Sequence, residues 1–552
     1  MNLRFWMAVL LGGCITLSAH AQSFTSSNLP IFIINTNGIN IQDDPKRPVG
    51  MGIIDNGVGK RNNLTDALNG YEGIIGIEYR GSSSQSFPKK PYGFETWTDD
   101  KGAEKNVSLL GFPSEHDWIL NPNYNDKTMM RNVLVYWLAN KMGRYATRTR
   151  YCEVVLNGSY EGVYVLQEKI KRDKNRVNIS SIKNTDNTGD ALTGGYIVKI
   201  DKTTGARDKS WNSPFKPDPR SSISPLFLVE TPKYEDITET QFNYIKSYIV
   251  GFETALYSPD FTDAENGYRK YIDVPSFVDY FLLTELSKAV DGFRLSTYMY
   301  KDRDSKGGKL SMGPAWDYDI ALGNGNYYDA FKPTGWQYKV NSLMPIPATP
   351  PNQEDPFKAP AWWSRLLDDP DFAKQVKSRW FFLRQNVFKT ETIMNYIDST
   401  ATGLNESQER NFQRWRILGQ YVWPNSFIGR TYQEEVNWLK DWIRQRLIWL
   451  DAQYEPFGIV TGSEPIKTNQ LSVFPNPSTY EAIIEYTVPQ QNQLLLTIHD
   501  LSGRVITQLA EGEHQPGEYK VTIPNGLVSS GVYLIHYQLA NQPALVKKWF
   551  KR

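Results

Sequence analysis

The chain has 552 residues, of which 40% are hydrophobic and 22% charged, so it is globular and long enough for roughly two to four domains. Its 61 basic and 60 acidic residues give a net charge of +1, which predicts no general attraction to nucleic acid or to anionic membranes. Aromatic residues make up 13%, a high share that is common in extracellular proteins that contact sugars or other surfaces.

The first 21 residues have the pattern of a secretory signal peptide. One cation, Arg4, precedes an apolar stretch to Leu17, and the small residues Ala19 and Ala21 fit cleavage after Ala21. Lipidation at Cys14 is the weaker alternative, because the apolar core before it would be very short. No later stretch approaches the roughly 20 apolar residues of a membrane span. We therefore expect a mature chain outside the cytoplasm, with no transmembrane span.

Cleavage would leave Cys152 as the single thiol, so no intramolecular disulfide is expected. Cys152 lies in a strand pattern and is expected to be buried and inert rather than a nucleophile. With five His and no H-E-x-x-H spacing, the sequence also argues against a zinc site.

Apolar patterns predict the elements of the large middle region. Strands rich in β-branched and aromatic residues are expected at residues 30–34, 73–80, 92–97, 153–156 and 162–167. A helix is expected over residues 130–142, with Gly143 as its stop. Asn157 and Gly158 are a strong hairpin signal between the last two strands. After about Pro232 the patterns are mostly helical, so we expect an α+β body with a sheet-rich first part and a helical second part.

The organisation changes near Phe457. A Trp-rich helical pattern ends there, and the polar residues 458–469 are expected to be a linker. Short strands at 482–488, 494–499 and 531–537 recur between turn signals, which predicts a small all-β sandwich over residues 470–552.

Within this sandwich, several motifs resemble a type IX secretion C-terminal sorting domain, also called a Por secretion tail. They are residues 473–478 (Val-Phe-Pro-Asn-Pro-Ser), 500–504 (Asp-Leu-Ser-Gly-Arg), 531–534 (Gly-Val-Tyr-Leu) and the basic end 547–552. The resemblance implies transport by the type IX secretion machinery across the outer membrane of Bacteroidetes, and usually cleavage at the surface. The alternative is an ordinary carbohydrate-binding or immunoglobulin-like appendage.

Two features of the middle region suggest phosphate and metal. A loop of small residues after Arg80 leads to Lys89 and Lys90, and such a loop can bring backbone N–H groups and a lysine to phosphate oxygens. Asp317 and Asp319 share a face if they lie in a strand. Mg²⁺ held by one or two carboxylates and substrate phosphates would relieve the repulsion between them, whereas Ca²⁺ usually recruits more protein oxygens.

Taken together and in order, several segments resemble the CotH family, which is named for a spore-coat protein and has an atypical protein-kinase-like fold. They are residues 80–84 with 89–92, 117–121, 126–128 with 131–132, 156–164 with 168, 194–197 and 316–319. The resemblance implies a two-part kinase-like body, here residues 29–457. It also implies phosphoryl transfer from ATP, with Mg²⁺, to Ser or Thr of an exported protein.

The resemblance also implies roles for individual residues. Lys90, or its neighbour Lys89, would hold the nucleotide phosphates, and Glu168 would orient that lysine. Asp317 would bind Mg²⁺, with Asp319 as a second ligand or support.

Other roles stay open at this stage. Arg131 and Asn132 would order the site or contact phosphate, and either Asp201 or Asp291 would be the base. The ordinary kinase signatures G-x-G-x-x-G, H-R-D and D-F-G are absent in recognisable form.

The expected location creates a conflict, because ATP is scarce outside the cell. The second hypothesis is therefore a non-catalytic surface protein that uses the fold to bind a polysaccharide or a protein partner. Several Trp residues of the helical part are candidate sugar platforms, although Trp438, Trp442 and Trp449 share one helix face and fit a core better. Trp362 and Trp363 are left open between the two interpretations.

Overall fold

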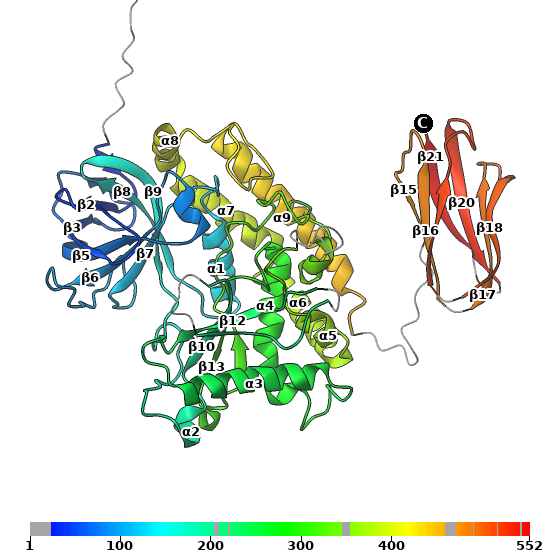
Figure 1. The fold of residues 1–552 in the computed structure, drawn as a ribbon. Coiled ribbons are helices and arrows are strands. Elements are labelled where there is room, and N and C mark those ends of the chain that lie inside the picture. Colours follow the sequence, from blue (N-terminus) through cyan, green and yellow to red (C-terminus); the bar gives the residue numbers. More distant parts are fainter. Residues whose placement is uncertain are drawn as a thin grey trace, which may run out of the picture. The chain divides into compact units, whose positions relative to one another are not determined.

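The computed structural model describes residues 24–203, 209–218, 221–344, 354–458, 471–489, 491–515, 517–540, 542 and 544–552 (Figure 1). The chain divides into two compact units, Met1–Gly458 and Ile459–Arg552, which are described separately below. The expected signal peptide and nearly all of the expected linker lie outside the described residues. The secondary structure is mixed α+β, as expected.

A closed seven-stranded barrel forms the first part of the larger unit. In spatial order its strands are β2 (Ile31–Asn35), β3 (Arg47–Ile54), β5 (Tyr71–Tyr79), β6 (Tyr92–Trp97), β7 (Asp117–Asn121), β9 (Ser159–Glu168) and β8 (Thr149–Leu156). Parallel pairing of β2 with β8 closes it. Asn157 and Gly158 both have positive φ, at 50° and 78°, as the predicted tight hairpin requires. The sequence predicted most of these strands but not their closure.

Cys152 belongs to the barrel core and is fully buried. Burial raises the pKa of its thiol, so the thiolate that nucleophilic chemistry needs is disfavoured. The structure thus supports the expected inert thiol.

A five-stranded sheet follows the barrel, in the order β11 (Ser210–Asn212), β12 (Leu226–Thr231), β10 (Tyr196–Ile200), β13 (Thr297–Lys301) and β14 (Leu310–Met312). Helices α1 (Arg131–Lys141), α3 (Glu239–Tyr257) and α4 (Val274–Ser287) lie close to it in Figure 1. The sequence analysis treated the region after Pro232 as mostly helical and missed β13 and β14. β13 pairs with β10, about a hundred residues earlier, which is a long-range contact, and β14 pairs with β13 at the edge of the sheet.

The helical part is completed by α5 (Trp362–Leu367), α6 (Pro370–Arg384), α7 (Thr390–Gly403), α8 (Asn405–Arg414) and α9 (Tyr432–Tyr454). Shorter elements are β1 (Ser26–Ser27), β4 (Asn62–Asn63), α2 (Gly189–Leu192) and the 3-10 turns Ser83–Ser86, Tyr268–Lys270, Asp304–Lys306 and Gln337–Leu343. Trp362 and Trp363 are buried, as is Trp442, while Trp438 and Trp449 pack against the same core. These five residues are core and not sugar platforms.

Helix α8 fastens the helical part to the barrel. Arg410 donates to the buried carboxylate of Glu153 at 3.1 Å. The Asn411 side-chain oxygen accepts from Lys89 Nζ at 2.9 Å and from the Val163 amide at 3.1 Å. Barrel and helices therefore share buried polar contacts.

The second unit is a small β-sandwich, as predicted. One sheet contains β15 (Leu471–Phe474), β16 (Ala482–Val488) and β19 (Gly517–Ile523), and the other β18 (Val505–His514), β17 (Asn492–His499), β20 (Gly531–Leu539) and β21 (Leu545–Lys551). The Asn476 side chain donates to the Lys548 carbonyl and accepts from the Phe550 amide. The Pro-Asn-Pro-Ser motif thus clamps the basic final strand.

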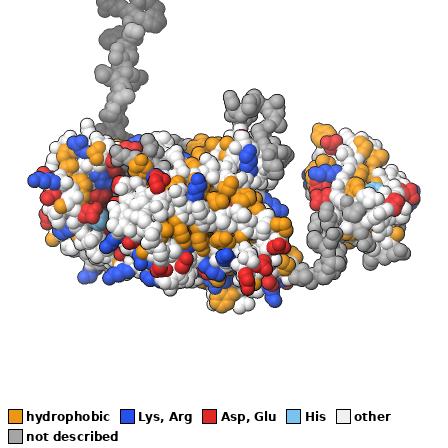
Figure 2. Space-filling model, turned by 60° about the horizontal axis from the view of Figure 1, so that its bottom comes forward, with side chains coloured by type: hydrophobic (Ala, Val, Ile, Leu, Met, Phe, Trp, Pro, Cys, Tyr) orange, Lys and Arg blue, Asp and Glu red, His pale blue; other side chains and the backbone are white. Residues whose placement is uncertain are grey.

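No helix in the described ranges is long and apolar enough to cross a bilayer. Figure 2 shows acidic and basic side chains intermixed over the face it presents, in keeping with the near-zero net charge.

Candidate functional site

Asp317 and Asp319 lie in a turn after β14, not in a strand as expected. We call residues 316–322 the aspartate turn. Asp317 has φ 67°, a left-handed conformation that Asp tolerates better than most residues. Helix α1 holds the turn: the Asp317 amide donates to Tyr136 Oη at 3.1 Å, and the Tyr318 amide to Asn132 Oδ1 at 2.6 Å. Backbone strain of this kind persists where surrounding contacts enforce it, often at functional sites.

Negative charge is concentrated around Asp317. Asp317 is accessible to solvent, whereas Asp319 is half-buried. The protein around Asp317 displaces water from its carboxyl, and the charges of Asp319, Asp291 and Asp201 repel it, so that its pKa is raised well above the ordinary value. Asp319 accepts a hydrogen bond from Asn125 Nδ2 at 2.5 Å, and burial raises its pKa too. Such a surplus of carboxylates favours a bound cation.

The residues present fit a magnesium ion that also contacts a phosphate. In the part of the chain that the structure describes, no group of three or more His, Cys, Asp or Glu side chains is arranged to hold a metal on its own. Two neighbouring carboxylates with a solvent-accessible side match the sites in which Mg²⁺ takes one or two protein ligands and completes its shell with water and substrate phosphate.

Ser296 is a site residue that the sequence analysis missed. Its hydroxyl donates to Asp317 Oδ2 at 3.4 Å, and its backbone is left-handed, with φ 48°. Its amide donates to the carboxylate of Asp201, which also accepts from the Lys202 amide at 2.9 Å. The signal was present in the sequence: Ser296 follows Asp291 by five positions, the spacing between the base and the metal-binding Asn in the catalytic loop of ordinary protein kinases.

The two candidate bases differ in their contacts. Asp201 is held by two backbone amides and lies 3.9 Å from Lys199 Nζ. Asp291 is paired with Arg294 at 3.0 Å, and its pKa is raised by burial in spite of that pairing. Both charges act on Asp317, so the structure brings the two candidates to one site.

Arg131 and Asn132, at the start of α1, support the aspartate turn. Arg131 is buried, donates to Asp126 Oδ1 at 2.5 Å and to the Ala321 carbonyl at 3.1 Å. Both Arg131 and Asn132 therefore hold the backbone of the aspartate turn. Of the two roles expected for them, this geometry provides the ordering role.

Lys89 and Lys90 have protein partners. Lys89 is buried and donates to the carbonyls of Pro122 and Val163 and to Asn411 Oδ1, and burial lowers its pKa to about 7. Lys90 is half-buried and donates to the Gln85 carbonyl at 2.6 Å. The contacts of Lys89 are those of a structural lysine.

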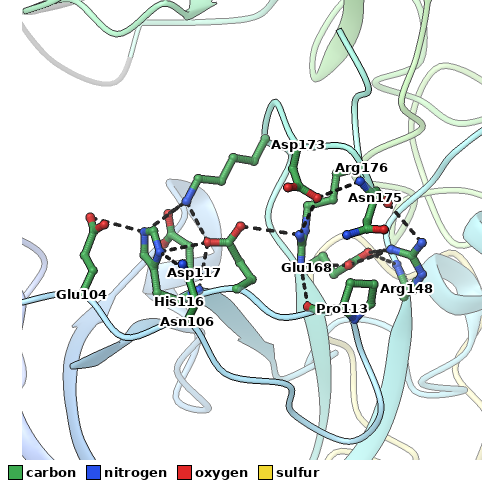
Figure 3. A network of polar contacts seen from close by, with 12 residues as sticks. Glu104, Asn106, Pro113, His116, Asp117, Arg148, Glu168, Asp173, Asn175 and Arg176 are labelled. Atoms are coloured by element: carbon green, nitrogen blue, oxygen red, sulfur yellow. Dashed lines mark hydrogen bonds and ion pairs between the residues drawn. The ribbon is translucent and has the colours of Figure 1, made fainter. Parts of the chain in front are cut away.

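Glu168 has different partners from the lysine expected for it. It pairs with Arg148 at 2.8 Å and with Arg176 at 3.1 Å (Figure 3). Figure 3 shows this cluster continuing through Asp173 and, farther along the barrel rim, a group around His116. Glu168 is thus part of a charge network at the end of β9 and does not orient Lys89 or Lys90.

Arg80 reaches from the end of β5 toward the aspartate turn. Its guanidinium lies 5.9 Å from the ring centroid of Trp316, and its charge acts on Tyr136, the acceptor of the Asp317 amide. Among the residues expected to contact phosphate, Arg80 is therefore the one whose contacts lead to the aspartate turn.

An aromatic pair marks another edge of the site. The rings of Tyr327 and Trp423 are stacked, with centroids 6.2 Å apart, and Trp423 is 46% exposed. The charges of Asp291 and Asp319 act on the Tyr327 hydroxyl. An exposed aromatic surface thus adjoins the carboxylates.

Comparison with known proteins yields two family matches. Residues 77–450 match the model described as CotH kinase protein, and residues 472–552 match the model described as Secretion system C-terminal sorting domain. No curated protein matches the chain.

One solved structure found by the comparison is Pseudomonas fluorescens alkylpurine DNA glycosylase AlkC bound to DNA containing an abasic site analog. It is 14% identical, with a TM-score of 0.12, over 34% of this chain and 54% of that one. The chain thus spans about half the length of that protein, and at this TM-score the likeness carries no argument.

The sorting domain indicates export by the type IX secretion machinery to the cell surface or beyond. The first match covers well over half of the chain and contains the whole acidic cluster and its supports. The chain therefore belongs to the CotH kinase protein family.

Proposed function

We propose that this protein is an exported phosphotransferase that uses ATP and Mg²⁺ to phosphorylate Ser or Thr hydroxyls of other exported proteins. The observation that carries the proposal is the strained, solvent-accessible Asp317, placed among the charges of Asp319, Asp291 and Asp201. An apo protein gains nothing from this arrangement, because like charges repel. A metal–nucleotide complex would relieve the repulsion.

Asp317 and Asp319 would hold the metal, and the Ser296 hydroxyl would support Asp317. When bound, Mg²⁺ would neutralise negative charge on the transferring phosphate. Asn125 keeps the Asp319 carboxylate in place, and α1 keeps the turn in its left-handed conformation. Arg80 would contact phosphate oxygens from the barrel side.

Asp291 would act as the base and Asp201 as the residue that positions Ser296. Asp201 already accepts two backbone amides, whereas Asp291 is paired with Arg294. Asp291 would take the proton of the acceptor hydroxyl as its oxygen bonds to the γ-phosphorus. The bond from that phosphorus to the bridging oxygen would break, and ADP would leave. The barrel and the sheet-and-helix part would then correspond to the two parts of a kinase-like body.

The test is the Asp317→Asn variant of the full chain. Asn tolerates φ 67° as well as Asp does, so the fold should persist by circular dichroism. We expect the parent, but not the variant, to show a rise in Tm with ATP and Mg²⁺ together, and phosphate transfer to a protein substrate to be lost. Asp398→Asn, on the exposed face of α7, is the control. An unchanged response in Asp317→Asn would refute the metal role.

A second candidate function is a surface binding protein that does not transfer phosphate. The exposed side chains of Trp423 and Tyr421, with Asn326 donating to the Tyr421 hydroxyl at 3.1 Å, resemble a sugar-binding surface. This function predicts retention on a glycan column that Trp423→Ala abolishes, without any response to nucleotide.

A further inference from the structure

A cavity of about 220 Å³ adjoins the segment that leads into the aspartate turn. Its wall includes the apolar residues Met312, Pro314 and Ala315. It shares Arg144 and Asp279 with an open hollow of about 650 Å³, formed between α4 and α6. An inner chamber, whose wall also includes the polar residues Arg176 and Ser276, therefore continues into an outer mouth.

The mouth carries more positive than negative charge. Asp279 is almost fully buried and accepts from Arg144 Nε and from Arg379 Nε, each at 2.7 Å. Lys374, exposed on α6, lines the same hollow. Asp273 adds one carboxylate 3.5 Å from Arg144, outside the lining. The lining of the mouth thus holds three cations and one carboxylate, and both guanidinium groups are partly exposed and oriented by that carboxylate.

The inner chamber holds a further unused donor. Arg176 lines it and is buried, and its Nε has no hydrogen-bond partner among the described residues. The other nitrogens of Arg176 bind Asp173, Glu168 and the Pro113 carbonyl. A buried N–H without a partner is costly, which favours a ligand or water near it.

The cavity touches both supports of the aspartate turn. Residues 313–315 form part of its wall and lead directly into Trp316 and Asp317. Ala139 of helix α1 and Met142, which follows the helix, line the cavity, and near the N-terminal end of α1 Asn132 accepts the Tyr318 amide of the turn. A ligand that fills the chamber would therefore press on the turn and on the helix that holds it.

We propose that this cavity binds a small amphipathic anion, with a carboxylate, sulfonate or phosphate head at Arg144, Arg379 and Lys374 and an apolar body in the chamber, and that its binding rigidifies the aspartate turn. The mixture of apolar wall and convergent cations is what such a ligand needs. If the turn binds metal and nucleotide, thermodynamic linkage makes the coupling between the two sites reciprocal.

The probe is anilinonaphthalene sulfonate, an apolar anion whose fluorescence rises on binding, titrated into the full chain. We expect one saturable site whose affinity falls by about threefold or more in Arg144→Gln and in Lys374→Glu. Lys377→Glu, three positions along α6 and outside both linings, should bind like the parent. Asp317→Asn should also bind normally, which separates this cavity from the proposed metal site.

Hydrogen exchange tests the effect on the turn without any activity measurement. The probe should slow exchange in peptides covering residues 310–322 in the parent and in Lys377→Glu, but not in Arg144→Gln. Equal affinity for the parent, Arg144→Gln and Lys374→Glu would refute the site. Saturable, Arg144-dependent binding that leaves exchange unchanged would refute the coupling to the turn.

Discussion

The hydroxyl of Ser296 donates to the carboxylate of Asp317 at 3.4 Å, and both residues have left-handed backbones. They lie on different strand connections, Ser296 before β13 and Asp317 after β14. Two strained residues that face each other across a hairpin indicate a site that the surrounding fold holds in place, because each left-handed residue costs roughly 1 kcal/mol or more.

Replacing Ser296 by Gly tests the role of its hydroxyl separately from that of its left-handed backbone. Gly adopts φ 48° without strain, so the free energy of unfolding should stay the same or rise slightly. The hydroxyl contact with Asp317 is lost, so we expect the Mg²⁺ concentration for half-maximal ATP-induced stabilisation to rise about fivefold. Thermal shift at a series of Mg²⁺ concentrations measures it. An unchanged Mg²⁺ requirement would contradict a supporting role for the hydroxyl.

Arg131→Met should destabilise the larger unit strongly. The substitution leaves the fully buried Asp126 without its arginine partner, and breaking a buried pair in this way costs about 3–5 kcal/mol. Urea unfolding measures the loss. Arg131→Lys retains the charge and should lose less. If instead Mg-ATP binding disappears while the free energy of unfolding is unchanged, Arg131 contacts phosphate and does not merely order the turn.

Lys89→Met should lower stability without affecting nucleotide. It removes the lysine donor of the buried Pro122 and Val163 carbonyls and one of the two donors to Asn411 Oδ1, at a cost of roughly 2 kcal/mol. Lys90→Met is the matched variant, because it makes the same change at the neighbouring lysine, which is only half-buried. A loss of the Mg-ATP response in Lys90→Met, with stability intact, would assign the phosphate contact to Lys90.

Stability should depend on pH through Glu253. Its carboxyl accepts from Ser213 Oγ and Trp362 Nε1, and burial raises its pKa from 4.5 to about 7. Between these values the folded state binds a proton that the unfolded state has lost. The contribution is therefore complete below pH 4.5 and is lost as pH rises through 7, by up to about 3 kcal/mol.

The Glu253→Gln variant isolates the contribution of this titration to stability, because its amide keeps an acceptor and does not titrate. Urea unfolding at several pH values should show parent and variant converging at low pH and the variant more stable at pH 8. A constant difference across this range would show that the Glu253 pKa is not shifted in the folded state.

Features that depend on neighbouring residues could be predicted from the sequence. The Asn157-Gly158 hairpin, the helix that begins near Arg131 and the sandwich strands follow from turn chemistry and apolar periodicity, which act over a few residues. The order of the motifs was equally visible and led to the family. The spacing of Asp291 and Ser296 is also visible in the sequence.

Only the tertiary structure decided which polar groups meet. Lys89 binds Asn411, 322 positions later, and Glu168 binds Arg148 and Arg176 in place of a lysine. A sequence shows that such residues can form hydrogen bonds or ion pairs, but not which partner folding brings into contact. The same reason applies to Asp317 and Asp319. The sequence suggested that this pair lies in a strand, whereas packing against α1 holds both residues in a strained turn.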